Sequence, residues 1–289
     1  MQILINIILS GAIYLLVALS FMLIYYSAKF LNISHAIILT ISAYISFSIQ
    51  QLNISLFIVI PLAIIITILI GISLEIIVFR NLRKSKNHSF VLLIASIGIY
   101  VILQNIISLI WGDETKSIRT GVVKAGNEVM GAYITDIQII IIISCVLLFL
   151  CVVALLNITS FGRQIRAVSS NEELADIFGI NSNKIILWAF VLGSGLAAIA
   201  GILVAFDTDI TPTMGFNLLI YGIVAMIIGG VGSTWGLVGG AFLLATAQHL
   251  GAYYIDSKWM DAIAYVILIL FLIWKPLGFS GKRLKKIEI

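Results

Sequence analysis

Long stretches of this chain carry no Lys, Arg, Asp or Glu, and short charged segments separate them. A membrane-spanning helix needs about 20 predominantly apolar residues, so the length of each run converts into a number of passes. The runs predict an all-α polytopic bundle of about nine membrane segments, with eight or ten as alternatives. The expected helices are Ile3–Tyr26, Ile33–Ile49, Ile54–Val78, Ser89–Trp111, Ile137–Leu156, Ile185–Phe206, two short helices within Ile210–Ile255, and Met260–Trp274.

Two regions leave the number of passes open, because either could be re-entrant. One is the segment after Asn32, and the other is Gly229–Gly240, where six of twelve residues are glycine. Each interior glycine costs a helix about 1 kcal/mol relative to alanine. We therefore expect broken or closely approaching backbone at a cavity there. The sparser repeat of Gly193, Ala197 and Gly201 predicts an ordinary helix-packing seam.

Composition places the whole chain in a membrane. Of 289 residues, 61% are hydrophobic and 10% charged, and the mean hydropathy is +1.17, whereas a soluble domain is about 45–50% apolar and about 25% charged. This excludes a single soluble catalytic domain, a nucleic-acid reader and a disordered scaffold. Residues 1–289 are expected to form one transmembrane domain, and the N-terminal segment is expected to remain as a span. Cys145 and Cys151 are predicted to be small core residues, since their spacing fits neither a metal site nor a redox motif.

Basic residues predict the orientation, because they concentrate in cytoplasmic loops. With the N-terminus outside and the C-terminus in the cytoplasm, 13 of the 17 basic residues face inward. The inward set is Lys29, Arg80, Arg83, Lys84, Lys86, Arg163, Arg166, Lys184, Lys275, Lys282, Arg283, Lys285 and Lys286, and the outward set is Lys116, Arg119, Lys124 and Lys258.

Polar residues near membrane depth leave two other classes of function open. An enzyme needs two acid–base groups that converge. Glu75 and Asp261 are both expected at interfaces, and neither is expected to lie deep beside another polar side chain. His35 and His249 lack a neighbouring carboxylate, and such histidines are more often packing residues than ligands. An ion-coupled secondary transporter is harder to exclude, although it usually has an acidic residue near mid-span.

Residues 157–184 form the longest inward-facing loop, and its pattern predicts a docking helix. Ser170 and Glu173 fit a capping box. Asn171–Phe178 then forms two helical turns, with an apolar face and an acidic face, before Gly179 ends the helix. Membrane-surface helices usually carry basic residues on the polar face, so this acidic one favours docking into a protein groove. The apolar face holds Leu174, Ile177 and Phe178, and the acidic face Glu172, Glu173 and Asp176.

These segments resemble a known family. GRQIRA (162–167) with NEELADIFGIN (171–181) is similar to the cytoplasmic loop of permease subunits of branched-chain amino acid ABC importers. Further similarities follow in the family's order: GAIYLLVAL (11–19), LNISHA (31–36), LIASIGI (93–99), Ser194–Gly201, TPTMGF (211–216), GGVGS (229–233), Gly239–Gly240 and WKPLGFSG (274–281). The chain has Ala36 where the family usually has glycine after the histidine.

The resemblance implies a permease subunit in the inner membrane of a bacterium, importing Leu, Ile or Val delivered by an extracytoplasmic solute-binding protein. It also implies two ATP-binding subunits and a second, related permease. Membrane lipid is the remaining expected partner, and the chain is not expected to bind nucleic acid. The chain has no GxxxxGK[ST] motif, so it is expected to hydrolyse no ATP itself. It is also expected to bind no cofactor or metal. Urea, short amides, sugars and nucleosides are carried by related permeases and remain alternatives.

The resemblance also assigns roles to residues. The ATPase-coupling segment is expected to comprise Gly162, Arg163, Arg166, Asn171, Glu172, Glu173, Leu174, Ala175, Ile177, Phe178 and Gly179. The translocation path is expected to involve Asn32, His35, Gly229, Gly230, Gly232 and Ser233.

Overall fold

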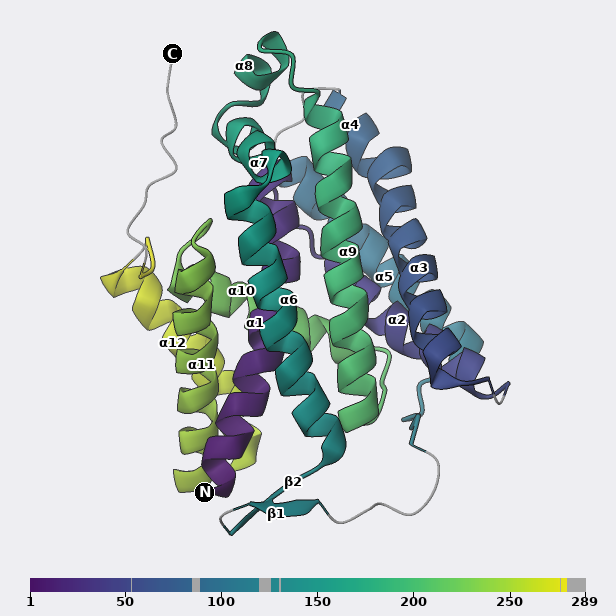
Figure 1. The fold of residues 1–289 in the computed structure, drawn as a ribbon, viewed down its shortest axis with the longest axis vertical. Helices are drawn as coiled ribbons and strands as arrows, with labels where there is room; N and C mark the ends of the chain where they lie inside the picture. The colour runs from purple at the N-terminus through teal and green to yellow at the C-terminus, as the bar shows by residue number, and fades with distance from the viewer. Residues whose placement is uncertain (53, 85–88, 120–125, 130, 276, 280–289) are drawn as a thin grey trace.

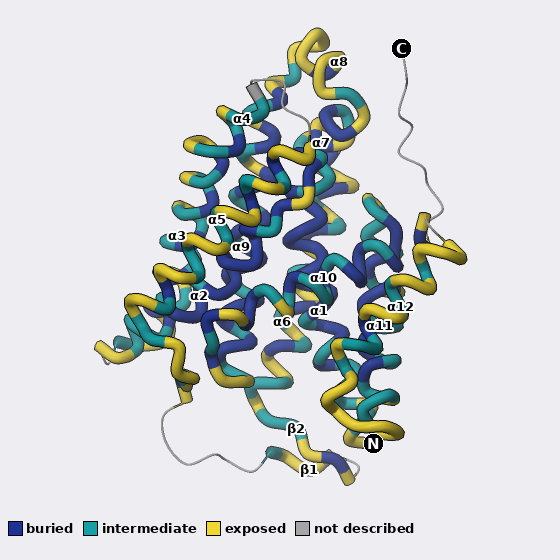
Figure 2. The backbone as a smooth tube through the Cα atoms, turned by 180° about the vertical axis from the view of Figure 1, so that it is seen from behind, coloured by how far each residue is buried: buried dark blue, intermediate teal, exposed yellow. Residues whose placement is uncertain are grey.

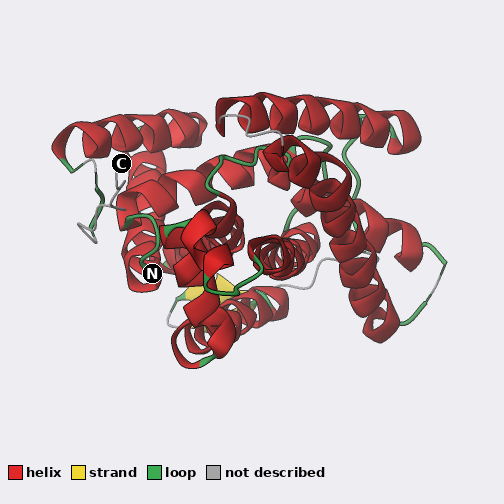
Figure 3. Cartoon of the chain, turned by 90° about the horizontal axis from the view of Figure 1, so that it is seen from above, coloured by secondary structure: helices red, strands yellow, loops and turns green. Residues whose placement is uncertain are grey.

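The computed structural model describes the chain except for residues 53, 85–88, 120–125, 130, 276 and 280–289. Apart from one small hairpin, yellow in Figure 3, the described elements are helices. In chain order they are α1 (Gln2–Ala28), α2 (His35–Gln50), α3 (Leu56–Leu74), the π-helical segment η1 (Glu75–Phe79), α4 (Arg80–Lys84), α5 (Ser89–Trp111), β1 (Asn127–Val129), β2 (Ala132–Ile134), α6 (Asp136–Ile158), α7 (Ser160–Ser170), α8 (Glu172–Ile177), α9 (Ser182–Asp207), α10 (Met214–Gly229), α11 (Thr234–Tyr254), the 3₁₀ segment η2 (Ser257–Trp259) and α12 (Met260–Trp274).

The predicted helical bundle is confirmed, and each expected membrane segment contains a helix. Six helical segments of the described chain are long and apolar enough to cross a membrane, or seven if α10 and α11 count as one bent span. The remaining segment, α2, has only 16 residues. The two regions where re-entry was an alternative are therefore the ones that depart from full-length spans.

Helix α1 forms the centre of the bundle. It packs against α6, α9, α10 and α11, and buried residues run through the middle of the molecule while outer helices such as α12 are exposed (Figure 2). Close packing uses small residues, as the seam prediction required. Gly193 faces Ile24 and the carbonyl of Ser20 on α1, and Gly201 faces the backbone of Leu39 on α2, so α9 fits between these two helices.

Helix α2 begins inside the bundle. The chain leaves α1 at Lys29, which adopts a left-handed conformation with φ of 59°, and then runs without regular structure to His35. The His35 ring contacts Ser20 of α1. Ser20 lies eight residues before the end of α1, which is about 12 Å from that end along the helix axis. Such irregular backbone is tolerated at membrane depth where protein buries it.

Helices α10 and α11 meet at a bend of 120°. At this bend the backbones of Gly229 and Gly236 approach so closely that a Cβ on either would clash with the other, and Gly240 lies against the carbonyl of Ala225. Gly230 has a φ of 92°, a value that L residues rarely adopt. The predicted close approach of backbone is confirmed, and its physical basis is the sharp turn between the two helices.

The predicted coupling helices and the hairpin lie at opposite ends of the molecule. α4, α7, α8 and the start of α9 lie at one end, whereas the hairpin and the N-terminus lie at the other (Figure 1). At the hairpin end, the backbones of Lys116 and Ile210 pair with each other. Of the basic residues used to predict orientation, Lys86, Lys124, Lys282, Arg283, Lys285 and Lys286 lie outside the described residues, as does the side chain of Lys84.

The prediction that both cysteines are core residues is half wrong. Cys145 is buried, but Cys151 is exposed. Both are on α6, and six residues along an α-helix correspond to 600°, so the two side chains point to different sides.

Candidate coupling site and translocation segments

The structure anchors α7 to the end of α6, and the residues predicted for coupling begin there. The backbone N–H of Gly162 donates to the Thr159 hydroxyl, which caps α7. A Cβ at Gly162 would clash with the carbonyl of Leu156, so glycine allows α7 to fold back against α6. The Arg166 guanidinium donates to that same carbonyl at 2.5 Å, and Arg163 donates to the carbonyl of Ile158 at 3.4 Å. Both arginines therefore satisfy carbonyl groups that the end of α6 leaves free.

Helix α8 starts one residue later than the capping-box pattern predicts. Asn171, rather than Ser170, is the N-cap, and its side-chain oxygen accepts from the N–H of Leu174 at 3.0 Å. Both residue types cap helices well, but Ser170 is still the last residue of α7. The sequence pattern therefore identified the helix start correctly to within one residue.

The predicted stop at Gly179 is confirmed. Gly179 has a φ of 83°; its N–H donates to the carbonyl of Asp176, and the N–H of Ile180 donates to the carbonyl of Ala175. This pair of hydrogen bonds is the Schellman ending of a helix. It makes the end of α8 a defined turn.

The apolar face of α8 is presented to solvent at the end of the molecule. Leu174, Ile177 and Phe178 are 46%, 77% and 82% exposed, whereas Ala175 is buried at 4%. Glu172 and Glu173 are also exposed. Exposed apolar side chains rimmed by polar ones mark an interaction surface, and we refer to Leu174, Ile177 and Phe178 as the α8 patch.

Two further contacts fix α8 to the start of α9. The carboxylate of Asp176 accepts from the N–H of Ser182 at 2.9 Å, and the Ser182 hydroxyl donates to the carbonyl of Glu172 at 3.2 Å. α8 therefore cannot tilt without moving the first turn of α9, which is one of the long helices that contact α1.

An ion pair that the sequence reading missed lies beneath this end. The expectation that Glu75 would not lie deep beside another polar side chain is wrong: its side chain is 0% exposed and pairs with Arg83, with an Nη2–Oε1 distance of 2.5 Å. A buried carboxylate requires such a partner. The pair could not be predicted from the spacing of eight residues in a regular α-helix. The π-helical segment η1 inserts an extra residue and so brings Arg83 onto the same helix face as Glu75.

Arg83 also acts on α8. Desolvation raises the pKa of Glu172 above its usual value, while the positive charge of Arg83 acts in the opposite direction. Arg83 thus influences carboxylates on η1 and on α8. It connects the end of the third membrane segment electrostatically with the predicted coupling segment.

The first predicted path segment is buried at the start of α2. Asn32 and His35 are 3% and 1% exposed. The Asn32 side-chain oxygen accepts from the Ser34 hydroxyl at 2.6 Å, and the Ile33 N–H donates to the hydroxyl of Ser96 on α5 at 3.0 Å. His35 Nε2 lies 3.0 Å from the Ser20 hydroxyl, while its Nδ1 has no partner among the described residues.

The second predicted path segment, comprising Gly229, Gly230, Gly232 and Ser233, forms the α10–α11 turn. Ser233 caps α11 by accepting from the N–H of Gly236 at 3.0 Å. Gly232 has a φ of 86° and lies against the ring of Tyr26 on α1. Its left-handed conformation and this contact both disfavour any larger residue.

The two path segments share α1 as a neighbour but lie at different levels along it. His35 lies at Ser20 and Gly232 at Tyr26, six residues apart, or about 9 Å along the helix axis. Among the described residues, no hydrogen bond joins the two segments.

Polar pairs that the sequence reading missed lie nearer the opposite end. His249 Nε2 lies 2.8 Å from the Ser10 hydroxyl. The Tyr221 hydroxyl donates to Asp261, so Asp261 has a polar neighbour, but its side chain is exposed rather than deep, as expected. The partners come from different helices, so local sequence carried no signal for them.

Comparisons with known proteins agree with this architecture. The family described as the permease component of the branched-chain amino acid transport system matches residues 3–272. The chain belongs to this family. The high-affinity branched-chain amino acid transport system permease protein LivH of Salmonella typhimurium is 30% identical, covering 94% of this chain and 92% of LivH. The corresponding permease protein BraD of Pseudomonas aeruginosa is 29% identical, covering 98% of this chain and 96% of BraD.

A solved structure shares the fold. The structure of PsaBC from Streptococcus pneumoniae in complex with Fab has a TM-score of 0.52 and 13% identity, and the similarity covers 97% of this chain and 94% of that one. The likeness extends over nearly the whole helical bundle. At this identity it supports the fold alone.

Proposed function

We propose that the chain is the membrane-spanning permease subunit of an ATP-driven importer of branched-chain amino acids, working with two ATP-binding subunits, a second related permease and an extracytoplasmic solute-binding protein. Family membership over residues 3–272 supports the class and the substrates. The single observation in the structure that carries the proposal is the α8 patch, since a helix tied to α9 presents three exposed apolar side chains at the end of the helical bundle. The chain itself performs no covalent chemistry in this account.

In the proposed mechanism, an ATP-binding subunit holds the α8 patch in a groove. ATP-driven closure of the two ATP-binding subunits moves α8, and the hydrogen bonds to Ser182 pass this movement to α9. α9 packs on α1 and α2 through Gly193 and Gly201, so the movement reaches the buried start of α2. The path has two arrangements, one open to each side of the membrane. The closed ATP-binding subunits favour one arrangement, so their closing and opening exposes the path to each side in turn.

The proposed path includes Asn32, His35 and the α10–α11 turn. Support comes from the position of the irregular backbone before α2, which lies at membrane depth where such backbone must be covered by protein or line a path. The unpartnered Nδ1 of His35 leaves one buried polar atom there available.

Transport assays can separate the proposal from its alternatives. Proteoliposomes containing the chain and its partners should accumulate radiolabelled leucine only with ATP and the binding protein, and excess isoleucine or valine should compete. Uptake by this chain alone, driven by a sodium or proton gradient, would identify a secondary transporter instead. Competition by urea but not by isoleucine would support the proposed importer class but would contradict the assignment of branched-chain amino acids as substrates.

A further inference from the structure

A groove runs along the side of the molecule from the α8–α9 connection toward the middle of the membrane. Its upper part has a volume of about 580 Å³ and lies between α7, the end of α6 and the first turns of α9. A second cavity of about 270 Å³ continues it between α6 and α9, sharing Leu155 and Leu192 with the first. We call the two together the α6–α9 groove.

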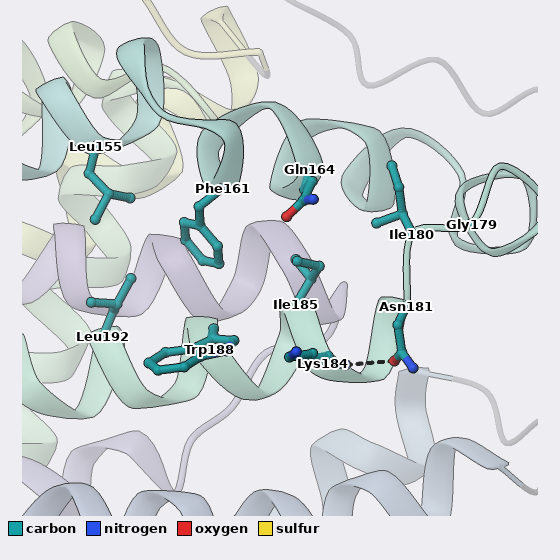
Figure 4. Close-up of a pocket in the computed structure, with 10 residues that line it drawn as sticks. All are labelled: Leu155, Phe161, Gln164, Gly179, Ile180, Asn181, Lys184, Ile185, Trp188 and Leu192. Carbon is teal, nitrogen blue, oxygen red and sulfur yellow. Dashed lines mark hydrogen bonds between the residues drawn. The ribbon is translucent and has the colours of Figure 1, made fainter.

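The polarity of this groove changes along its length. Gln164, Asn181 and Lys184 lie at one end, and Leu155, Trp188 and Leu192 lie at the other (Figure 4). Beyond Leu192 the lining is apolar and reaches Ile199. From Lys184 to Ile199 the groove follows α9 for about 22 Å, somewhat more than the roughly 15 Å of hydrocarbon in one leaflet.

The polar end carries a positive charge that is not neutralised. Among the residues that the structure describes, no carboxylate lies within ion-pair distance of the Lys184 ammonium group. The nearest acidic helix residue along the chain, Asp176, already accepts a hydrogen bond from the N–H of Ser182. Trp188, one turn further into the membrane and 50% exposed, has the residue type and depth of an interfacial anchor.

We infer that the α6–α9 groove binds one anionic phospholipid, with its headgroup at Gln164, Asn181 and Lys184 and one acyl chain along Leu192 toward Ile199. The match of charge and depth favours a lipid over a protein, because the cation lies at the level of the headgroups and the lining below it is apolar. This inference does not depend on the proposed transport function.

Lipid binding to the full-length chain, purified in detergent and stripped of lipid, tests the inference. Phosphatidylglycerol or phosphatidylcholine is added back, and bound lipid is counted by native mass spectrometry. Lys184→Gln should weaken phosphatidylglycerol binding about fivefold and leave phosphatidylcholine binding unchanged. Lys275→Gln, which removes the same charge at the end of α12 outside the groove, is the matched control and should behave as the wild type.

A second substitution tests the acyl-chain part. Cys151→Trp places a large side chain in the apolar cavity at an exposed position, so it should reduce retention of both lipids. Leu109→Trp, at an 86% exposed position on α5, is its control. Equal phosphatidylglycerol retention by the wild type and Lys184→Gln, or unchanged retention by Cys151→Trp, would overturn the inference. A disulfide-linked dimer formed in membranes by the variant Trp188→Cys with Cys151→Ser would also overturn the inference, because a second copy of the chain would then cover the groove.

Discussion

At the end of the molecule that carries α4, α7 and α8, burial decides what single residues do. Glu75 is fully buried and Arg83 is its partner. Removing one member of a buried pair is far more costly than removing both, because the remaining charge is left without compensation. The pair is thus a requirement of the fold at the point where the third membrane segment approaches α8.

Substitution of the pair provides a test at this scale. Arg83→Ala should lower the stability of the chain by about 3–5 kcal/mol, whereas the double variant Glu75→Leu with Arg83→Ala should recover much of that loss. Thermal unfolding in detergent measures both. Glu114→Ala, which removes the exposed partner of Lys116, should change stability by less than about 1 kcal/mol. Equal losses for Arg83→Ala and the double variant would show that the charges do not interact.

At the scale of elements, the sequence predicted where helices occur better than how they cross the membrane. Runs of Ile and Leu located every membrane segment, because span length depends on local apolar residues. The bend between α10 and α11 followed from the glycine cluster. The depth of α2 could not be calculated, since it depends on His35 reaching Ser20 of another helix. In the coupling segment the pattern predicted the exposed face and Gly179, but not the ties from Asp176 and Glu172 to Ser182.

The contact between α9 and α2 allows a matched comparison of two glycines. A Cβ at Gly201 would clash with the backbone of Leu39, whereas a Cβ at Gly98 of α5 would meet nothing within 4 Å. Gly201→Ala should therefore lower the free energy of unfolding by about 1–3 kcal/mol, because the added methyl group overpacks the contact. Gly98→Ala should be neutral or slightly stabilising, because alanine is the better helix former. Thermal unfolding of the two variants decides this, and equal stability would contradict the packing of α9 on α2.

At the scale of the whole molecule, orientation follows from the separation of its two ends. Most basic residues were predicted to be cytoplasmic, and α4, α7 and α8 share one end of the structure (Figure 1). We therefore expect α8 inside the cell and the β1–β2 hairpin outside.

Cysteine labelling in intact cells tests this orientation. In a background with Cys145→Ala and Cys151→Ser, a membrane-impermeant maleimide should label Tyr133→Cys, which is 58% exposed in the hairpin. Ile177→Cys, which is 77% exposed on α8, should be labelled only after the cells are opened. The reverse pattern would invert the orientation and place the α8 patch beyond the reach of cytoplasmic ATP-binding subunits.

In the proposed mechanism, the α8 patch transmits ATP-driven movement to the membrane helices. The most direct measurement is the amount of leucine imported per ATP hydrolysed by the reconstituted transporter carrying Leu174→Asp with Phe178→Asp. Leu52→Asp with Tyr133→Asp, at exposed positions of the opposite end, is the control. We expect the α8 variant to insert normally but to lose at least about 90% of its import per ATP, since placing charges in an apolar interface costs more than the 1.4 kcal/mol that corresponds to tenfold. The control should keep the wild-type ratio. Import per ATP at the wild-type level in the α8 variant would contradict the proposed mechanism.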